Sequence, residues 1–281
     1  MVSVKIQGGL GNQLFQYAFA RAQSARKAEP FCLSDGFGYD YLLPSFFENI
    51  ENKPSLFSNL TKKLSSQKKF DVENQWLSPS ENLANFDAHK NTFYEGFFQS
   101  EQYFSDYKNK LCHDFEIKKK YQIDARRWLG MAPDQPYVAF HIRGGDYADF
   151  GNEELGGQNL CLPFDYYAKA WQLVCPFFFD SFHAVWVSDE NPKMIEQKMQ
   201  LFENQQLIRH HFVRYPQEIM DFQTLMQANI IVTANSSFSW WAAYLSQATQ
   251  IFAPQHWLGY KIGQEFPCQI IPKNWSQIKI F

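Results

Sequence analysis

The sequence lacks an excess of charge of either sign. Its 281 residues include 26 lysines and arginines and 29 aspartates and glutamates, which gives a formal net charge of −3. A protein that binds nucleic acid through a broad electrostatic field usually carries a strongly basic surface. We therefore expect no nucleic-acid partner for this chain.

Cysteine is scarce and widely scattered. The five cysteines form no CxxC pair, and their number is odd. This pattern predicts reduced thiols in a cytosol-like compartment, without a cysteine-bound metal cluster. The positions are Cys32, Cys112, Cys161, Cys175 and Cys268.

Long hydrophobic runs are missing as well. Runs such as CPFFF, residues 175–179, are far shorter than the roughly 20 residues that span a bilayer. No charged n-region and apolar h-region precede the first predicted strand, so we expect no signal peptide and a cytoplasmic location.

One polar segment, residues 55–75, is locally basic. We interpret it as a solvated helical arm or loop, and the alternative is a weak peripheral contact with the inner face of the membrane. Its lysines are Lys62, Lys63, Lys68 and Lys69.

The chain does contain a regular alternation of strands and helices, which predicts an α/β fold with parallel sheets covered on both faces. Apolar runs predict strands at 2–6, 137–142, 183–188, 229–233 and 250–254, and helical periodicity predicts helices at 163–175, 192–202, 216–228 and 237–247. A charged segment, 118–136, ends in prolines and marks a boundary. We expect two α/β domains, residues 1–135 and 136–281, facing each other across a cleft.

Aromatic residues make up 18% of the chain. The favoured interpretation is a core rich in phenylalanine, and the alternative is carbohydrate binding, because the C–H faces of sugars pack on aromatic rings. We assign Trp240 and Trp241 to the core side of a helix.

Three glycines, Gly8, Gly9 and Gly11, follow the first predicted strand, and helical periodicity begins at Leu14. Such a corner exposes N–H groups at a helix N-terminus and suits an anion. It matches neither the Walker loop nor the G-x-G-x-x-G pattern. A tight turn with Asn12 as the helix cap is the alternative interpretation.

A second polar cluster, His141, Arg143 and Asp146, lies where the strand 137–142 ends. A guanidinium beside two glycines suits a phosphate, because its N–H fork can bind two oxygens at once. The alternative is an ion pair between Arg143 and Asp146 that pins the turn.

A third cluster follows the strand 229–233. Asn235, Ser236 and Ser237 come directly before a predicted helix, where free N–H groups and hydroxyls form a second anion cradle. Ordinary helix capping by one of the serines is the alternative. Two cradles and an arginine together predict a bound nucleoside diphosphate.

Four stretches of the chain resemble the motif blocks of the bacterial α-1,2-fucosyltransferases, glycosyltransferase family 11, and they occur in the same order. The resemblance implies a GT-B-like fold with two Rossmann-like domains. It also implies inverting, metal-independent transfer of L-fucose from GDP-fucose to the 2-hydroxyl of a terminal galactose, a galactoside 2-α-L-fucosyltransferase activity. No cofactor beyond the donor substrate is implied. The stretches are GGLGNQLFQYA (8–18), YEGFFQSEQYF (94–104), HIRGGDY (141–147) and NSSFSWWAAYL (235–245).

The resemblance assigns donor-binding roles in the C-terminal half. Arg143 would hold the β-phosphate and His141 would lie beside the nucleoside. Asp221 would read guanine, because it precedes Ser237 by the family's spacing, although an exposed helix position is the alternative. The residues lining the diphosphate would be Ser236, Ser237 and Phe238.

The resemblance also assigns roles to the glycine corner. Gly9 and Gly11 would close over the sugar diphosphate, and Asn12 would orient acceptor or donor. Asp146 is our first candidate for the general base, by position alone. At Gly144 the family commonly has a second arginine.

No metal site is expected, because no Asp-x-Asp set appears. The stretch Ser188-Asp189-Glu190 is the nearest candidate, and we interpret Asp189 as a loop anchor. Two other functions stay open: a transferase of the same fold with another donor or linkage, and a nucleotide-sugar or glycan-binding protein without turnover. The expected partners are GDP-fucose and a galactose-terminated glycan.

Overall fold

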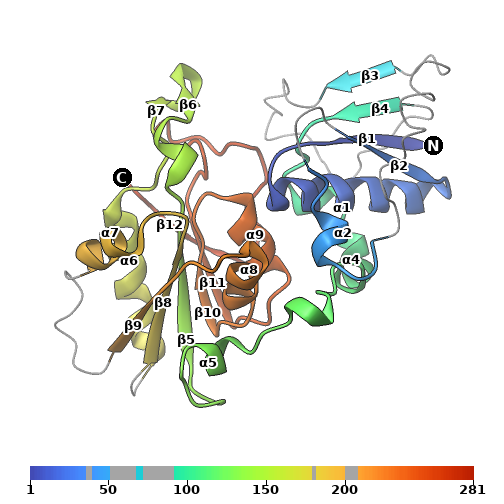
Figure 1. Ribbon diagram of the computed structural model, residues 1–281. Helices are drawn as coiled ribbons and strands as arrows, with labels where there is room; N and C mark the ends of the chain where they lie inside the picture. Colours follow the sequence, from blue (N-terminus) through green and yellow to red (C-terminus); the bar gives the residue numbers. More distant parts are fainter. Residues whose placement is uncertain (36–39, 51–67, 72–91, 179–181, 200–207) are drawn as a thin grey trace. The chain divides into compact units, whose positions relative to one another are not determined.

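The computed structural model describes residues 1–35, 40–50, 68–71, 92–178, 182–199 and 208–281 (Figure 1). The chain forms two compact units, one of Met1–Lys120 with Pro267–Pro272 and one of Tyr121–Phe266 with Lys273–Phe281. Each unit is described by itself. The functional boundaries predicted from the sequence, 1–135 and 136–281, stay a prediction.

The first unit contains a four-stranded parallel sheet in the order β2-β1-β4-β3. The buried run at β1 forms the predicted first strand, and the long helix α1 packs against the sheet, with Phe19 5.4 Å from Tyr94 ring to ring. The elements are β1 (Val2–Ile6), α1 (Leu10–Lys27), β2 (Phe31–Asp35), α2 (Leu43–Phe46), β3 (Lys68–Asp71), β4 (Thr92–Glu95) and α4 (Lys108–Asp114).

The segment 55–75 was expected to be a solvated helical arm or loop. For residues 68–71 that prediction is wrong, because they form strand β3 and pair with β4. Residues 55–67 and 72–75 lie outside the described residues.

The second unit contains a six-stranded parallel sheet in the order β12-β11-β10-β5-β8-β9. Strands β5 and β8 are buried along their whole length, as continuous apolar runs predict. The strands are β5 (Tyr137–Ile142), β8 (Phe182–Ser188), β9 (Ile208–Val213), β10 (Ile230–Val232), β11 (Gln250–Pro254) and β12 (Ser276–Ile278). A short antiparallel hairpin, β6 (Gly151–Asn152) and β7 (Gly157–Gln158), follows β5.

Helices cover both faces of this sheet, with α6 and α7 on one side and α8 and α9 on the other (Figure 1). Neighbouring residues of β5 show the two faces: Phe140 stacks on Trp171 of α6, whereas His141 lies beside Phe238 of α9. The predicted α/β alternation is therefore confirmed. The helices are α5 (Ala125–Trp128), α6 (Phe164–Val174), α7 (Pro192–Met199), α8 (Glu218–Met226) and α9 (Ser237–Tyr244).

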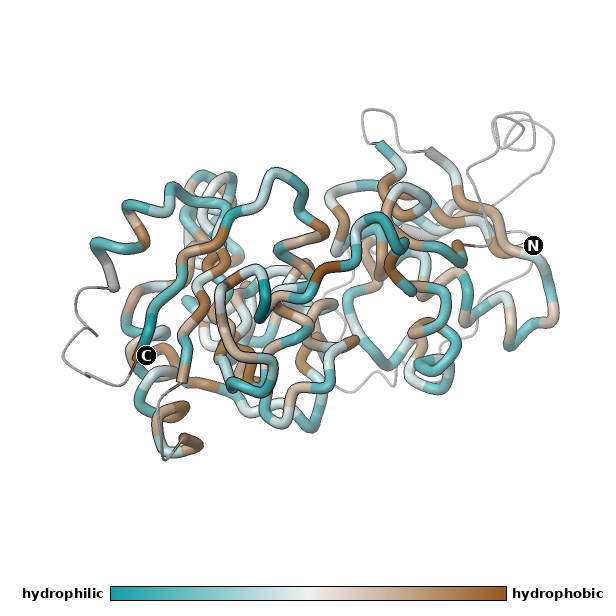
Figure 2. Tube along the Cα trace, turned by 60° about the horizontal axis from the view of Figure 1, so that its bottom comes forward, coloured by the Kyte–Doolittle hydropathy of each residue, from teal (hydrophilic) through white to brown (hydrophobic). Residues whose placement is uncertain are grey.

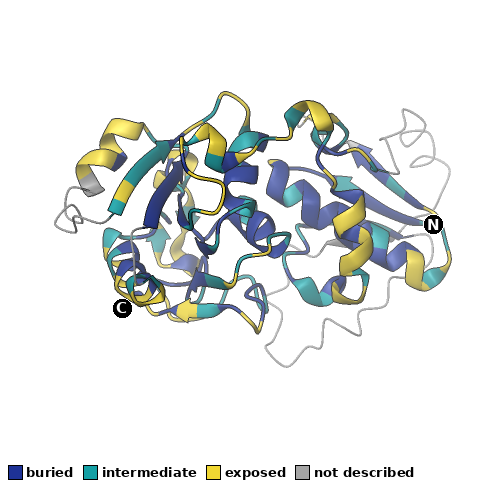
Figure 3. Ribbon diagram, turned by 90° about the horizontal axis from the view of Figure 1, so that it is seen from below, coloured by how far each residue is buried: buried dark blue, intermediate teal, exposed yellow. Residues whose placement is uncertain are grey.

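The aromatic residues supply much of the core. Trp240 and Trp241 are fully buried, which confirms their assignment to the interior, and strands β5, β8 and β10 are buried along their length (Figure 3). None of the five cysteines, all of which lie in the described part of the chain, forms a disulfide. Hydrophobic residues are interspersed with hydrophilic ones along the trace (Figure 2), and no helix among the described residues is long and apolar enough to cross a membrane.

Candidate functional site

Arg143 is the first residue after strand β5, at the carboxyl end of the sheet. On one side β5 pairs with β8, which ends at Ser188, and on the other with β10, which ends at Val232. Parallel strands bring their carboxyl ends to one edge, where α/β proteins bind ligands. The loops that follow β5, β8 and β10 therefore meet at the candidate site.

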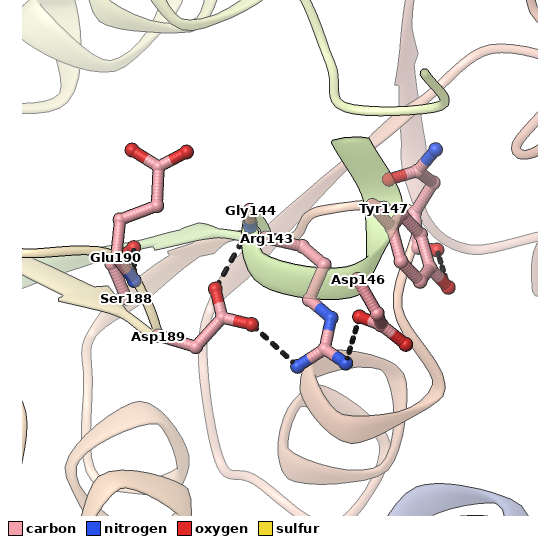
Figure 4. A network of polar contacts seen from close by, with 8 residues as sticks. Arg143, Gly144, Asp146, Tyr147, Ser188, Asp189 and Glu190 are labelled. Atoms are coloured by element: carbon pink, nitrogen blue, oxygen red, sulfur yellow. Dashed lines mark hydrogen bonds and ion pairs between the residues drawn. The ribbon is translucent and has the colours of Figure 1, made fainter. Parts of the chain in front are cut away.

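Two carboxylates hold the Arg143 guanidinium (Figure 4). Its Nη2 donates to Asp146 Oδ1 at 2.6 Å, and its Nη1 lies 2.7 Å from Asp189 Oδ2. The guanidinium carbon lies 5.2 Å from the centre of the Tyr147 ring, a cation–π contact. The ion pair that the sequence left as an alternative is present, and a second carboxylate joins it.

Asp189 also anchors the loop, as predicted from the sequence. Its Oδ1 accepts a hydrogen bond from the N–H of Gly144 at 2.8 Å. That N–H is therefore turned toward the Asp189 carboxylate. Of the two glycines after Arg143, Gly145 has a positive φ of +49°, whereas the φ of Gly144 is −116°. A Cβ at Gly144 would meet the side chain of Glu190, which would have to move aside for any other residue.

His141 is buried, with 4% of its surface exposed. Burial, and secondly the charge of Arg143, lower the pKa of its imidazole to about 3, so the ring is neutral near pH 7. Its Nδ1 is buried without a hydrogen-bond partner in the described part of the chain. A neutral imidazole with an unused nitrogen can donate to or accept from a bound polar group.

Helix α9 begins at Ser237, with Ser236 as the N-cap residue. The side chain of Ser236 makes no capping hydrogen bond, so side-chain capping is the wrong interpretation here. The first N–H groups of a helix have no partner within it, and those of α9 begin at Ser237 and Phe238. Tyr147 joins this loop to the arginine, since its hydroxyl donates to Asn235 O at 3.1 Å.

Helix α8 carries two acidic residues in its first turn, Glu218 and Asp221. Burial raises the pKa of Asp221 to about 6, although a hydrogen bond from the Tyr215 N–H (3.1 Å) and the charge of Arg214 oppose the shift. Burial also raises the pKa of Glu218, against the attraction of Arg143. Asp221 is thus partly buried, which corrects the alternative of an exposed position, and Glu218 was not predicted as a site residue.

In the first unit, α1 begins at Leu10 and its N-cap is Gly9. Gly8, with φ +76°, makes the turn, whereas Gly11 and Asn12 lie in the first helical turn. The alternative interpretation, with Asn12 as the helix cap, is wrong, and so is the expectation that Gly11 belongs to the turn. Asn12 Oδ1 instead accepts a hydrogen bond from Gln99 Nε2 at 2.8 Å.

The glycine corner is fixed by a buried glutamine that the sequence reading did not assign. Gln13 Nε2 donates to Gly8 O at 2.9 Å and to Asp40 O at 2.8 Å, and its Oε1 accepts from the Leu42 N–H at 2.9 Å. One side chain therefore ties the turn to the segment after β2. Helical periodicity gave no signal for this role, because it depends on residues distant in sequence.

The described residues contain no group of three or more histidine, cysteine, aspartate or glutamate side chains that could hold a metal ion. The carboxylate of Asp189, in the nearest candidate stretch, is shared between Arg143 and the Gly144 N–H.

The fold is that of the GT-B glycosyltransferases. The structure resembles the α-1,6-fucosyltransferase NodZ of Bradyrhizobium soaked with GDP-fucose, at a TM-score of 0.53 and 14% identity over 87% of this chain and 92% of that one. It also resembles a point mutant of Arabidopsis thaliana FUT1 in complex with GDP, at a TM-score of 0.53 and 12% identity. That match covers 90% of this chain and 70% of the other. The predicted GT-B-like fold is confirmed.

Residues 203–278 match the model of glycosyl transferase family 11. The chain is also 27% identical over 307 aligned positions to the alpha-1,2-colitosyltransferase of Escherichia coli, and the alignment covers 99% of each protein. These matches confirm the predicted resemblance to family 11 and the enzyme class, a glycosyltransferase.

Proposed function

We propose that the chain transfers L-fucose, with inversion, from GDP-fucose to the 2-hydroxyl of a terminal galactose. The observation that carries the proposal is the Arg143 guanidinium at the carboxyl end of β5, joined through Tyr147 to the loop before helix α9. A forked cation and a helix N-terminus in one loop cluster suit a nucleoside diphosphate.

The chemistry needs charge stabilisation on the leaving diphosphate. In the proposal, Arg143 binds the β-phosphate, where negative charge grows as the bond to the sugar breaks. The N–H groups at Ser237 and Phe238 and the hydroxyls of Ser236 and Ser237 bind the remaining phosphate oxygens. Neutral His141 contributes a hydrogen bond without adding charge beside the nucleoside.

Asp221 supplies base recognition in the proposal. Guanine presents N1–H and N2–H₂ donors side by side, and one carboxylate can accept from both. With a pKa of about 6, the Asp221 carboxyl is mostly ionised near pH 7. Partial burial strengthens such a hydrogen-bond pair, because water competes less for it.

Proton removal from the acceptor hydroxyl needs a carboxylate within hydrogen-bond reach. Asp146 remains our candidate, since its side chain is 69% exposed and thus accessible to an acceptor. Gly9, Gly11 and Asn12 of the first unit are proposed to contact the sugar or the acceptor. We assign residues 136–281 to donor binding and residues 1–135 to the acceptor side.

A second candidate concerns the donor sugar. The matched relative from Escherichia coli is named a colitosyltransferase, and colitose is the 3-deoxy form of L-fucose. GDP-colitose is therefore the alternative donor for the same site and the same α-1,2 linkage. The two sugars differ by one hydroxyl, which a pocket built to hydrogen-bond it can discriminate strongly.

The test is transfer by the purified protein from GDP-fucose and from GDP-colitose, each to lactose and N-acetyllactosamine. The product linkage is assigned by NMR, and an Arg143→Ala variant serves as the negative control. Transfer of fucose to O2 of galactose supports the proposal, and transfer of colitose alone supports the second candidate. Tight donor binding without any product would favour a binding protein and contradict both.

A further inference from the structure

The carboxylates near Arg143 carry more negative charge than its one guanidinium can neutralise. Asp146 and Asp189 both contact it, and Glu218 lies close enough for its pKa to respond to the arginine's charge. A diphosphate that binds to Arg143 must therefore compete with a carboxylate already there. The structure indicates which one yields.

Asp189 is the fixed partner. One of its oxygens pairs with Arg143 and the other accepts from the N–H of Gly144, so a single carboxylate orients both the guanidinium and the backbone of the loop. Its side chain is 29% exposed. The loop packs closely on it, because a Cβ at Gly145 would lie 2.8 Å from Asp189 Oδ2.

Asp146 is the loosely held partner. Its side chain is 69% exposed and lies three residues beyond the arginine on the short segment η5 (Gly145–Ala148). It pairs with Nη2 of Arg143, whose neighbouring Nε is buried without a hydrogen-bond partner. Nε and Nη2 form one edge of the planar group, so one anion with two oxygens can accept from both.

We propose that Asp189 is a positioning residue that keeps Arg143 aimed, whereas Asp146 occupies the arginine's outer edge until the donor diphosphate replaces it. The inference rests on the proposed function. The exchange gives Arg143 Nε a hydrogen-bond acceptor. It replaces the single charge of the exposed Asp146 carboxylate with the larger charge of a diphosphate. It also releases the Asp146 carboxylate at the moment the donor is in place, which suits a residue that then accepts a proton.

The test compares GDP affinity by titration calorimetry for the wild type, Asp146→Asn and Asp189→Asn, with Glu190→Gln as the matched charge control. If only bulk electrostatics operated, all three variants would bind GDP more tightly, because each removes one negative charge near the phosphates. The proposal predicts opposite signs. Asp146→Asn binds GDP about 3-fold to 10-fold more tightly, Asp189→Asn binds about 10-fold more weakly, and Glu190→Gln gains less than about 3-fold.

The asparagine at position 189 can still accept from the Gly144 N–H, and thermal unfolding without ligand checks that the variant is folded. A wild type that does not bind GDP would overturn the proposed function and this inference together. A wild type that binds GDP, with Asp189→Asn binding equally or more tightly, would overturn the positioning role alone. Weaker binding by Asp146→Asn would overturn the exchange, whatever the other variant does.

Discussion

The imidazole ring of His141 lies 5.7 Å from the phenyl ring of Phe238, with 36° between their planes. The contact joins the end of β5 to the first turn of α9 and buries the imidazole. Because burial lowers the pKa of His141 to about 3, folding favours the neutral ring. A buried neutral histidine makes stability depend on pH.

The sign follows from proton linkage. Between the ordinary histidine pKa of about 6.5 and the folded value of about 3, the unfolded chain binds the extra proton, so stability falls as the pH drops through that range. We expect His141→Gln to reduce the slope by as much as about 1.4 kcal/mol per pH unit. The measurement is urea unfolding of both proteins between about pH 7 and pH 4.

His183 and His211 also have lowered pKa values, that of His211 about 4, both mainly through burial. Both change the pH dependence in the same direction but are present in both proteins, so the difference in slope isolates His141. Parallel stability curves for the wild type and His141→Gln would show that His141 is accessible to protons in the folded protein.

Much of the second unit could be predicted from the sequence. The continuous apolar runs of β5 and β8 predicted buried strands, and helical periodicity predicted α6, α8 and α9. Strand β9 was missed, because IRHHFV lacks a clear pattern and lies partly exposed at the edge of the sheet. Its pairing with β8 is a long-range contact that local periodicity does not encode.

Some features of the candidate site could be predicted from the sequence, and others could not. Arg143 and the glycines after it were identified because residue type and strand end coincide. The pairing with Asp189 could not be predicted, since it depends on β8 lying next to β5 in the sheet. Residue order shows that a carboxylate follows a strand, but only the sheet order shows which cation it meets.

Arg143 is expected to matter in the transition state. Arg143→Ala should lower kcat/KM for transfer by about 10² or more, the effect of losing one strong contact to the developing charge. Arg143→Lys should restore little, because a point charge cannot reproduce the contacts of the planar fork with Asp189 and a phosphate. Steady-state kinetics with GDP-fucose checks both, and near-normal turnover by the alanine variant would contradict the assignment.

GDP binding should weaken in acid through Asp221. The pKa of its carboxyl is raised to about 6, mainly by burial, and only the ionised form accepts from guanine. Affinity should therefore fall by up to about tenfold per pH unit below pH 6, whereas Asp221→Asn should bind GDP about 1–3 kcal/mol more weakly and lack this dependence. Calorimetry across the pH range tests this.

Glu218 lies in the same first turn of α8, its charge helps to raise the pKa of Asp221, and its own pKa is also raised. A Glu218→Gln variant is the matched control, and it should retain the pH dependence because Asp221 is intact. If the pH dependence of GDP binding is lost in Glu218→Gln and retained in Asp221→Asn, the titrating group is Glu218, and the role given to Asp221 is wrong.

Transfer should not require a divalent metal. The proposed positive potential comes from Arg143 and from the N–H groups at the start of α9, which act without a bound ion. Turnover with GDP-fucose should therefore persist in excess EDTA. The picture is wrong if chelation abolishes transfer and Mg²⁺ or Mn²⁺ restores it.

The two glycines after Arg143 should respond differently to substitution. Gly145 has φ +49°, and a Cβ there would lie 2.8 Å from Asp189 Oδ2, so Gly145→Val should strain the backbone and displace the anchor of Arg143. We expect transfer to fall far more than tenfold. At Gly144 φ is −116°, and the atoms that a Cβ would meet belong to the flexible side chain of Glu190.

An arginine introduced at position 144 can move the Glu190 side chain aside and pair with its carboxylate. We therefore expect Gly144→Arg to change transfer of labelled fucose to N-acetyllactosamine by less than about tenfold, since exposed ion pairs contribute little and Arg143 keeps both of its partners. Thermal unfolding separates loss of fold from loss of turnover. A silent wild type that becomes active in Gly144→Arg would show that a second arginine is needed for turnover, and would favour a binding protein for the natural chain.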